Sequence, residues 1–489
     1  MASPGRSGAS GGTAVVPRGP FVTVSVFGAA ERGVANGGAD YGPDTPGTRT
    51  GGLDEAGLAL KATGGGTVYV LGGIGSALVV RGPVTFYDTV NYVGDGVTLR
   101  AAPGLLNPFT TDPEHAYFSG TIAGLTLDGA GVPGTTVLTL VSTQQSTFAD
   151  LVVRGAGVAP VPVANSPFTF TNGSNIPVLL ELVGGAVTSV HSNGVAGGPT
   201  AGLFTILPGA SLVVEFSIPP NLTQLGTGVL LTCSGSVAAH ESLQKVCGGN
   251  TFASLYVTGC GAALHLSGLP TPVTEVTNNV FLNLEQDPMH TVGVAGAGVV
   301  LGNNCDSNNF YRAKLALGVQ PNMTGVAVNT FAPNADVMIY QNTFSYLSVD
   351  ASDAPGQVGI ALGRNTSKPN RFDLYLPQPG LPVPVRFVSL MSHVLIRDQE
   401  NALLHLRGSK GRTGFVWTNE KFPGSGAAFR NDDYFPMLLT IQGGSVRSIA
   451  LNGQDLGMSS GTVLTKPGDS VTCVTLADPA VFRSLLTVG

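Results

Sequence analysis

The stretch Asn250-Thr251-Phe252, which continues as TFASLYVTG, decides the fold because it recurs along the chain. The later copies begin at Asn279, Asn308, Asn342 and Asn370. Successive copies are separated by 29, 29, 34 and 28 residues. A nearly constant period of this size is typical of a stacked-repeat protein, in which one unit cannot bury its apolar face without its neighbours.

Each repeat contains one strand pattern and almost no helix pattern. Apolar residues at Phe252, Leu255 and Val257 are followed by a glycine, as in a short strand with one buried face. Residues 122–129 and 148–155 share the pattern without the asparagine. A strand with turns in so short a repeat predicts a coil of strands, and the parallel β-helix fits best. The asparagines are expected to be structural, since an Asn side chain satisfies turn backbone groups and tolerates the left-handed conformation.

The composition excludes several classes of protein. Charged residues make up 11% of the 489 residues, against about a quarter in a typical globular protein, while hydrophobic residues reach 43%. The chain can therefore build a core and is not expected to be disordered. Because the net charge is −6 and Lys and Arg do not cluster, nucleic acid is not an expected partner. Glycine and proline interrupt the apolar stretches, so no membrane insertion is expected.

Targeting and cofactor motifs are not apparent. The first residues, MASPGRSGASGGTAVVPRG, lack the apolar core of a signal peptide, so we expect no export by that route. The five cysteines have no metal-ligand spacing, and neither a nucleotide-binding motif nor a Ser-His-Asp motif is recognisable. We therefore expect no cofactor and no metal.

The N-terminal part contains the clearest single helix. A strand at residues 22–29 ends in FGA, and a turn-rich segment leads to residues 53–62, which have acids in the first turn and Lys61 in the last. A glycine-bounded strand, GGGTVYVLGG, follows at residues 64–73. This order resembles the start of the pectate-lyase-like right-handed β-helix superfamily, whose short helix caps the open end of the coil. The resemblance covers residues 21–157, although YGPDTPGTRTGG is looser than the acidic turn common in that family.

A second repeat relates two distant segments. Residues 176–214 match residues 435–473 at a constant offset of 259, including Asn193-Gly194 with Asn452-Gly453. Asn-Gly between alternating apolar residues is a hairpin signal. We expect two copies of a small antiparallel β-sandwich module, one inserted into the coil and one ending the chain. The module resembles a carbohydrate-binding-like domain of virion proteins from phages that infect Actinobacteria.

These patterns predict an all-β chain with five parts. They are a docking arm at residues 1–20, the first part of the β-helix at 21–160, an inserted module at 161–226, the main β-helix at 227–424 and a C-terminal module at 425–489. A dense charged stretch between His393 and Arg407 is expected to be the closing turn of the coil or a subunit contact.

The candidate catalytic residues are four acids near the repeat strands: Glu285, Asp287, Asp306 and Asp350. Two carboxylates that flank a glycosidic bond suffice for hydrolysis. Glu285 and Asp287 would share one side of an extended strand, and Asp350 would lie roughly 10 Å away, two coils along. The alternative, which is the commoner case, is that these acids cap turns or face solvent. His290 and Arg312 could join a saccharide groove.

Three functions remain open. The first is a bacteriophage tail spike or minor tail protein that attaches to host cell-wall or surface glycan. The resemblance implies a homotrimer, and the N-terminal arm would contact other virion proteins. The second is a polysaccharide hydrolase or lyase on the same β-helix. The third is a passive head or tail decoration protein.

Overall fold

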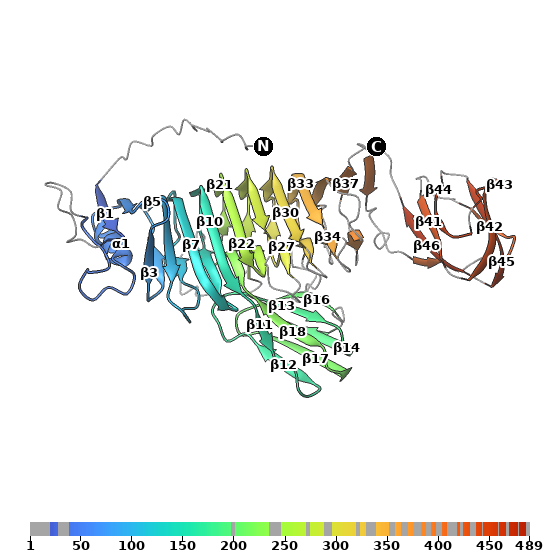
Figure 1. The fold of residues 1–489 in the computed structure, drawn as a ribbon, viewed down its shortest axis with the longest axis horizontal. Helices are drawn as coiled ribbons and strands as arrows, with labels where there is room; N and C mark the ends of the chain where they lie inside the picture. The colour runs from blue at the N-terminus through green and yellow to red at the C-terminus, as the bar shows by residue number, and fades with distance from the viewer. Residues whose placement is uncertain are drawn as a thin grey trace, which may run out of the picture.

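A computed structural model of the chain shows a long coil of strands with a small module projecting from its middle and another beyond its C-terminal end (Figure 1). It describes residues 20–27, 39–196, 201–233, 246–269, 274–287, 296–318, 323–328, 339–351, 357–362, 370–375, 383–387, 393–397, 403–407, 418–420, 424–430, 437–442, 444–457, 459–465, 469–477 and 479–485. The predicted docking arm lies outside these residues, apart from Pro20. Within them, no helix is long and apolar enough to cross a bilayer.

Three parallel sheets form the coil, and the predicted right-handed β-helix is confirmed. Sheet A contains β1 (Phe21–Ser25), β2 (Gly66–Leu71), β3 (Ala77–Val80), β5 (Val90–Ala101), β7 (Thr121–Pro133), β9 (Thr147–Ala149), β10 (Leu151–Gly157), β21 (Thr251–Phe252), β22 (Leu255–Cys260), β25 (Val280–Phe281), β26 (Leu284–Asp287), β29 (Asn309–Phe310), β30 (Ala313–Gly318), β33 (Thr343–Ala351), β35 (Arg371–Tyr375), β37 (His393–Arg397) and β38 (Leu403–Arg407). Sheet B contains β4 (Val84–Phe86), β6 (Phe109–Thr111), β8 (Thr136–Val141), β19 (Thr227–Thr232), β23 (Ala262–Ser267), β27 (Ala297–Leu301), β31 (Thr324–Val328), β34 (Val358–Leu362) and β36 (Val383–Phe387). Sheet C contains β20 (Val246–Gly248), β24 (Glu275–Thr277), β28 (Cys305–Asp306) and β32 (Ile339–Tyr340).

The repeated phenylalanines form one buried stack along the coil. Successive ring centroids are 4.1 to 5.1 Å apart, and the planes of Phe281, Phe310 and Phe344 are nearly parallel. Each such aromatic pair contributes about 0.5–1.5 kcal/mol beyond its buried area. The stack therefore fixes the register between coils.

The repeated asparagines form a second buried ladder, as expected for a structural role. The Nδ2 of Asn279 donates to the Oδ1 of Asn308 at 2.9 Å and to the carbonyl oxygen of Cys247 at 3.1 Å. Asn250, Asn308 and Asn342 donate in the same way. The expected left-handed conformation belongs instead to the residue before each of the first four asparagines: Gly249, Asn278, Ser307 and Gln341. This residue turns the corner between sheets C and A, which aims the asparagine side chain inward.

The predicted capping helix is α1 (Leu53–Ala62), at the N-terminal end of the coil (Figure 1). It buries Leu53, Ala56 and Leu60 against the first coils. At the other end, β38 pairs antiparallel with β37, so a hairpin within the charged stretch between His393 and Arg407 ends sheet A.

Both modules consist of two four-stranded antiparallel sheets that share one apolar cluster. The inserted module has β11 (Ala159–Val161), β12 (Phe168–Thr171), β13 (Val178–Val183), β14 (Ala186–Ser192), β15 (Val195–Ala196), β16 (Gly202–Ile206), β17 (Ser211–Ile218) and β18 (Asn221–Leu225). The C-terminal module has β39 (Thr418–Glu420), β40 (Ala428–Arg430), β41 (Met437–Gln442), β42 (Ser445–Leu451), β43 (Gln454–Asp455), β44 (Gly461–Thr465), β45 (Ser470–Ala477) and β46 (Ala480–Leu485). The order of strands in the sheets is the same in both copies.

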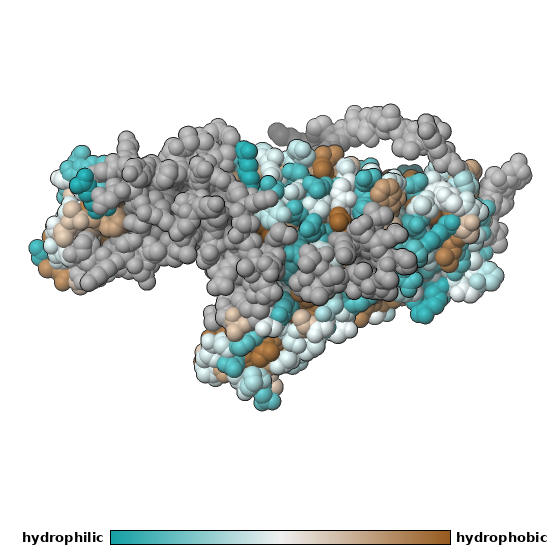
Figure 2. Space-filling model, turned by 180° about the vertical axis from the view of Figure 1, so that it is seen from behind, coloured by the Kyte–Doolittle hydropathy of each residue, from teal (hydrophilic) through white to brown (hydrophobic). Residues whose placement is uncertain are grey.

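The inserted module packs on the outer face of sheet B. Leu179, Leu203 and Leu225 form an apolar cluster with Ala262, Ala297, Val300 and Ala327 of the coil. Thr205 also bonds His265 of β23 at 3.2 Å. Strand β13 is therefore buried on both faces. Elsewhere, on the side shown in Figure 2, exposed apolar residues form small separate patches among polar ones.

Candidate functional site

Three of the four candidate acids lie on the outer face of sheet A. Glu285 aligns with Tyr256 in the preceding coil and with Lys314 in the next. Asp287 follows Glu285 by two residues and therefore faces the same side. Counting from the register of β26 and β30, Asp287 aligns with Ala316, and Ala316 aligns with Asp350. We call Tyr256, Glu285, Asp287, Lys314 and Asp350 the acidic face.

Lys314 is the centre of the acidic face. Its Nζ lies 2.8 Å from the Oε1 of Glu285, and both side chains are well exposed. The hydrogen bond and charge of Glu285 raise the pKa of Lys314, and the charges of Asp287 and Asp350 add to this effect. One lysine is therefore paired with Glu285, and the carboxylates of Asp287 and Asp350 lie close enough to favour its positively charged form. Lys314 was not predicted from the sequence, although it lies four residues after Phe310, as Glu285 does after Phe281.

Asp287 is held by a tyrosine from the preceding coil. The hydroxyl of Tyr256 donates to the Oδ2 of Asp287. This hydrogen bond is the main reason that the pKa of Tyr256 is raised. The carboxylate of Asp287 is thus oriented along the surface of the sheet.

One exposed leucine and two exposed tyrosines border the acidic face. Leu282 and Tyr311 follow the buried phenylalanines of adjacent coils, and Tyr346 lies at the same bend in the next coil. Tyr311 and Tyr346 are 53% and 49% exposed. Arg312, expected to join a saccharide groove, is exposed at this bend. The surface thus offers aromatic rings, carboxylates and cations within a few coils.

Asp306 lies elsewhere, on sheet C. It aligns with Thr277 and Tyr340, and its charge adds to the burial that raises the pKa of Glu275. The left-handed corner at Ser307 separates it from sheet A. The structure therefore does not bring Asp306 together with Glu285, Asp287 and Asp350. His290 lies outside the described residues.

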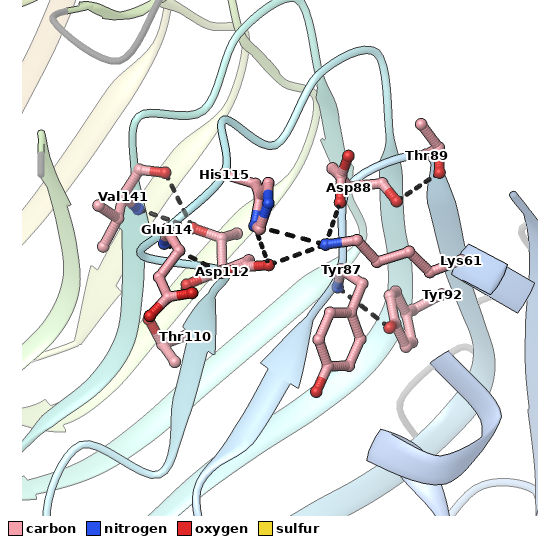
Figure 3. Close-up of polar contacts among 11 residues, drawn as sticks. Lys61, Tyr87, Asp88, Thr89, Tyr92, Thr110, Asp112, Glu114, His115 and Val141 are labelled. Atoms are coloured by element: carbon pink, nitrogen blue, oxygen red, sulfur yellow. Dashed lines mark hydrogen bonds and ion pairs between the residues drawn. The ribbon is translucent and has the colours of Figure 1, made fainter. Parts of the chain in front are cut away.

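A second polar network, which the sequence analysis missed, lies at the N-terminal end (Figure 3). The Nζ of Lys61 pairs with Asp88 at 2.9 Å and with Asp112 at 3.1 Å, and His115 contacts Asp112 at 2.9 Å. Burial acts to raise the pKa of Asp112, but the amide of Glu114 and the partners Lys61 and His115 outweigh it and lower the pKa. Because Lys61 ends α1 while both aspartates follow strands of sheet B, this network fastens the capping helix to the coil.

Metal ligands do not gather in the described part of the chain: no group of three or more His, Cys, Asp or Glu side chains there could hold an ion. All five cysteines are free and buried.

Comparison with known proteins gives structural likenesses only. No protein-family model matches the chain, and no curated protein sequence matches it. Among solved structures, the chain is similar to the tailspike protein of Escherichia coli bacteriophage HK620 in complex with a pentasaccharide, with 10% identity, a TM-score of 0.35 and coverage of 95% of this chain and 93% of that chain. It is also similar to the tailspike protein gp49 of Acinetobacter baumannii bacteriophage Fri1, a capsular polysaccharide depolymerase, with 9% identity, a TM-score of 0.26 and coverage of 89% and 82%.

Proposed function

We propose that this chain is a virion tail spike or minor tail protein that attaches to a host-surface glycan through the acidic face of sheet A. The observation that carries the proposal is the ion pair of Lys314 with Glu285 beside the column of Asp287 and Asp350, on an exposed surface bordered by Tyr311 and Tyr346. Carboxylates and an ammonium group provide both acceptors and donors for sugar hydroxyls. Tyrosine offers an apolar ring for the face of a sugar and a hydroxyl for hydrogen bonding.

The open, solvated geometry favours binding over chemistry. Glu285 is neutralised by Lys314, and Asp287 already accepts a hydrogen bond from Tyr256. A general acid usually needs a site that shields it from water, whereas Glu285 is 39% exposed. Attachment needs several modest contacts, and the acidic face supplies them from successive coils.

Polysaccharide hydrolysis is the second candidate, and one observation favours it. Asp287 and Asp350 share one column, with the small side chain of Ala316 between them. Two coils correspond to roughly 10 Å, close to the separation of about 6.5–9.5 Å that an inverting pair requires. Asp287 or Asp350 would then be the general acid and the other the general base.

Incubation of the purified chain with host cell-wall polysaccharide tests both candidates. We expect no release of reducing ends or unsaturated products over a day, together with retention of the chain on whole cells. Product release that Asp287→Asn and Asp350→Asn abolish would establish the hydrolase. Absence of both product release and retention on cells would contradict attachment. The decoration protein would then be the better account.

A further inference from the structure

Two arginines share one buried carboxylate on the outer face of sheet A. They lie in coils that precede the inserted module in the sequence. Arg100 of β5 and Arg154 of β10 align with Asp128 of β7 from its two sides. The Nε of Arg100 lies 3.2 Å from the Oδ2 of Asp128, and the Nε and Nη2 of Arg154 each lie 3.1 Å from the same oxygen. The other oxygen, Oδ1, accepts from the amide of Ala130 at 2.8 Å. Asp128 is therefore fully engaged while it draws the two guanidinium groups together.

The two cations are only partly neutralised. Asp128 offsets one positive charge, which leaves a net charge of +1 on the three side chains. A guanidinium group has more N–H donors than these contacts use. In the part of the chain that the structure describes, neither the Arg100 nor the Arg154 side chain has a hydrogen-bond partner besides Asp128, and these side chains are 47% and 40% exposed. Unused donors of both arginines therefore face solvent from one fixed position.

This geometry suits a small oxyanion. Arginine recognises carboxylate and phosphate through paired N–H donors in a planar fork, and Asp128 fixes the orientation of both forks. A neutral hydroxyl would gain less from the same donors, because the strongest of these hydrogen bonds are charge-assisted.

The arginines belong to the same column as two residues of the acidic face. The register runs from Arg100 through Asp128, Arg154 and Thr258 to Asp287, and onward through Ala316 to Asp350. Arg154 and Asp287 are two coils apart, which is roughly 10 Å. One end of this column therefore carries net positive charge and the other carries carboxylates.

We propose that Arg100 and Arg154 form an anion subsite that binds a carboxylate or phosphate group of the glycan. This step rests on the proposed function, because it takes the anion to be part of the attached glycan. The subsite holds the charged group of the ligand in the coils of β5 to β10, which precede the coil of β22. The uncharged sugars then extend along the column toward Tyr256 and Lys314. The ligand class is therefore an acidic glycan that carries a uronic acid or a phosphate.

Calorimetric titration of the full chain with glucuronate, inorganic phosphate and neutral methyl glucoside tests the subsite. We expect one of the two anions to bind saturably and methyl glucoside to bind far more weakly. The anion with the higher affinity indicates whether the glycan carries a uronic acid or a phosphate. Arg154→Gln and Arg100→Gln should each weaken anion binding by at least about tenfold, because charge-assisted hydrogen bonds are lost.

Two comparisons distinguish anion binding by the arginines from their contribution to the stability of the coil. Arg154→Lys keeps the charge but loses the fork, so it should weaken the anion less than Arg154→Gln. A melting temperature lowered by the Gln variants, with unchanged anion affinity, would show that the arginines only tie the coils together and would overturn the proposal. Absence of saturable binding of either anion to the unmodified chain would also overturn it.

Failure of the proposed function would give a different experimental result from failure of the anion subsite. The pair Tyr311→Ala and Tyr346→Ala lies outside the subsite and should leave glucuronate and phosphate affinity unchanged. If this variant also retains full binding to cells, attachment through the acidic face is wrong whatever the anion titration shows.

Discussion

Lys314 Nζ lies 2.8 Å from Glu285 Oε1 in the preceding coil, and this contact places a cation among three carboxylates on the surface of sheet A. Because the two side chains are 49% and 39% exposed, the pair stabilises the fold by less than about 1 kcal/mol. Its importance is therefore expected in ligand binding rather than in folding.

Replacing Lys314 should separate these two effects. Lys314→Met removes the charge that holds Glu285, and we expect a change of less than about 1 kcal/mol in the free energy of unfolding. Cell binding should fall several-fold, since the ligand loses an ammonium donor. Urea denaturation and a quantitative cell-retention assay measure the two quantities. A large loss of stability with full retention would contradict this assignment.

Lys61 provides the matched comparison at the N-terminal end. Its partners Asp88 and Asp112 are more buried than Glu285, so Lys61→Met leaves Asp88 without its cation and removes one of the two basic partners of Asp112. We expect a loss of about 1–3 kcal/mol, because buried charged groups depend strongly on their partners. Limited proteolysis should then cut near α1 first. Equal stability of the Lys61 and Lys314 variants would count against the fastening role of this network.

The pH dependence of that network has a definite sign. The pKa of Asp112 is held below its usual value of 3.8, so the carboxylate favours the folded state. Its contribution to stability is present above pH 3.8 and is lost as the pH falls below it. Denaturation below that pH should become less sensitive to pH in Asp112→Asn.

The asparagine ladder should respond sharply to one substitution. Asn308 is fully buried, and its amide bonds Asn279, Asn342 and the carbonyl of Val276. Asn308→Ala leaves buried backbone groups unpaired, each at about 1–3 kcal/mol, so we expect several kcal/mol of destabilisation. Asn309→Ala is the control, because among the described residues its side chain bonds only the nearby carbonyl of Ser307. Similar urea midpoints for the two variants would mean that the ladder adds little.

We expect Glu181 to make the docking of the inserted module sensitive to pH. It alternates with the core residues of β13 and is 6% exposed on the side that faces sheet B, where burial raises its pKa to about 8. His265, also at this interface, has a pKa lowered to about 3 by burial, so it supplies no positive charge near neutral pH.

The folded state therefore keeps a proton on Glu181 that the unfolded chain releases above about pH 4.5. Stability from this group is highest below pH 4.5 and falls as the pH rises toward 8. Glu181→Gln should flatten the pH dependence of urea denaturation between pH 5 and 8, by several kcal/mol at most. Glu215→Gln, an exposed acid of the same module bonded to Ser189, should leave it unchanged. An identical pH profile for Glu181→Gln and the unmodified chain would refute the assignment.

The period of the sequence was sufficient to predict the coil, because the asparagine and phenylalanine occupy the same corner in each repeat. The same period also contained information about the candidate site that the predictions did not use. The sixth residue after each of these phenylalanines, from Phe148 to Phe344, is Arg154, Thr258, Asp287, Ala316 and Asp350, which is the column that the structure shows.

Other features could not be obtained by counting. The left-handed residue lies one position before the asparagine at Gly249, Asn278, Ser307 and Gln341, and a pattern of side chains does not contain that backbone constraint. The network of Lys61 depends on how α1 packs on sheet B. The docking of the inserted module had a faint signal in β13, whose run VLLELV is nearly all apolar, as in strands buried on both faces.

Affinity for purified host-surface glycan, compared between the unmodified chain and the pair Tyr311→Ala and Tyr346→Ala, tests the central claim most directly. Phe118→Ala is the control, because it removes an exposed aromatic ring that aligns through Gln144 with sheet C and not with the acidic face of sheet A. We predict that the tyrosine pair lowers the affinity at least about tenfold, as expected for loss of two aromatic contacts, while the control leaves it unchanged. Equal affinity of all three proteins would contradict attachment through this face.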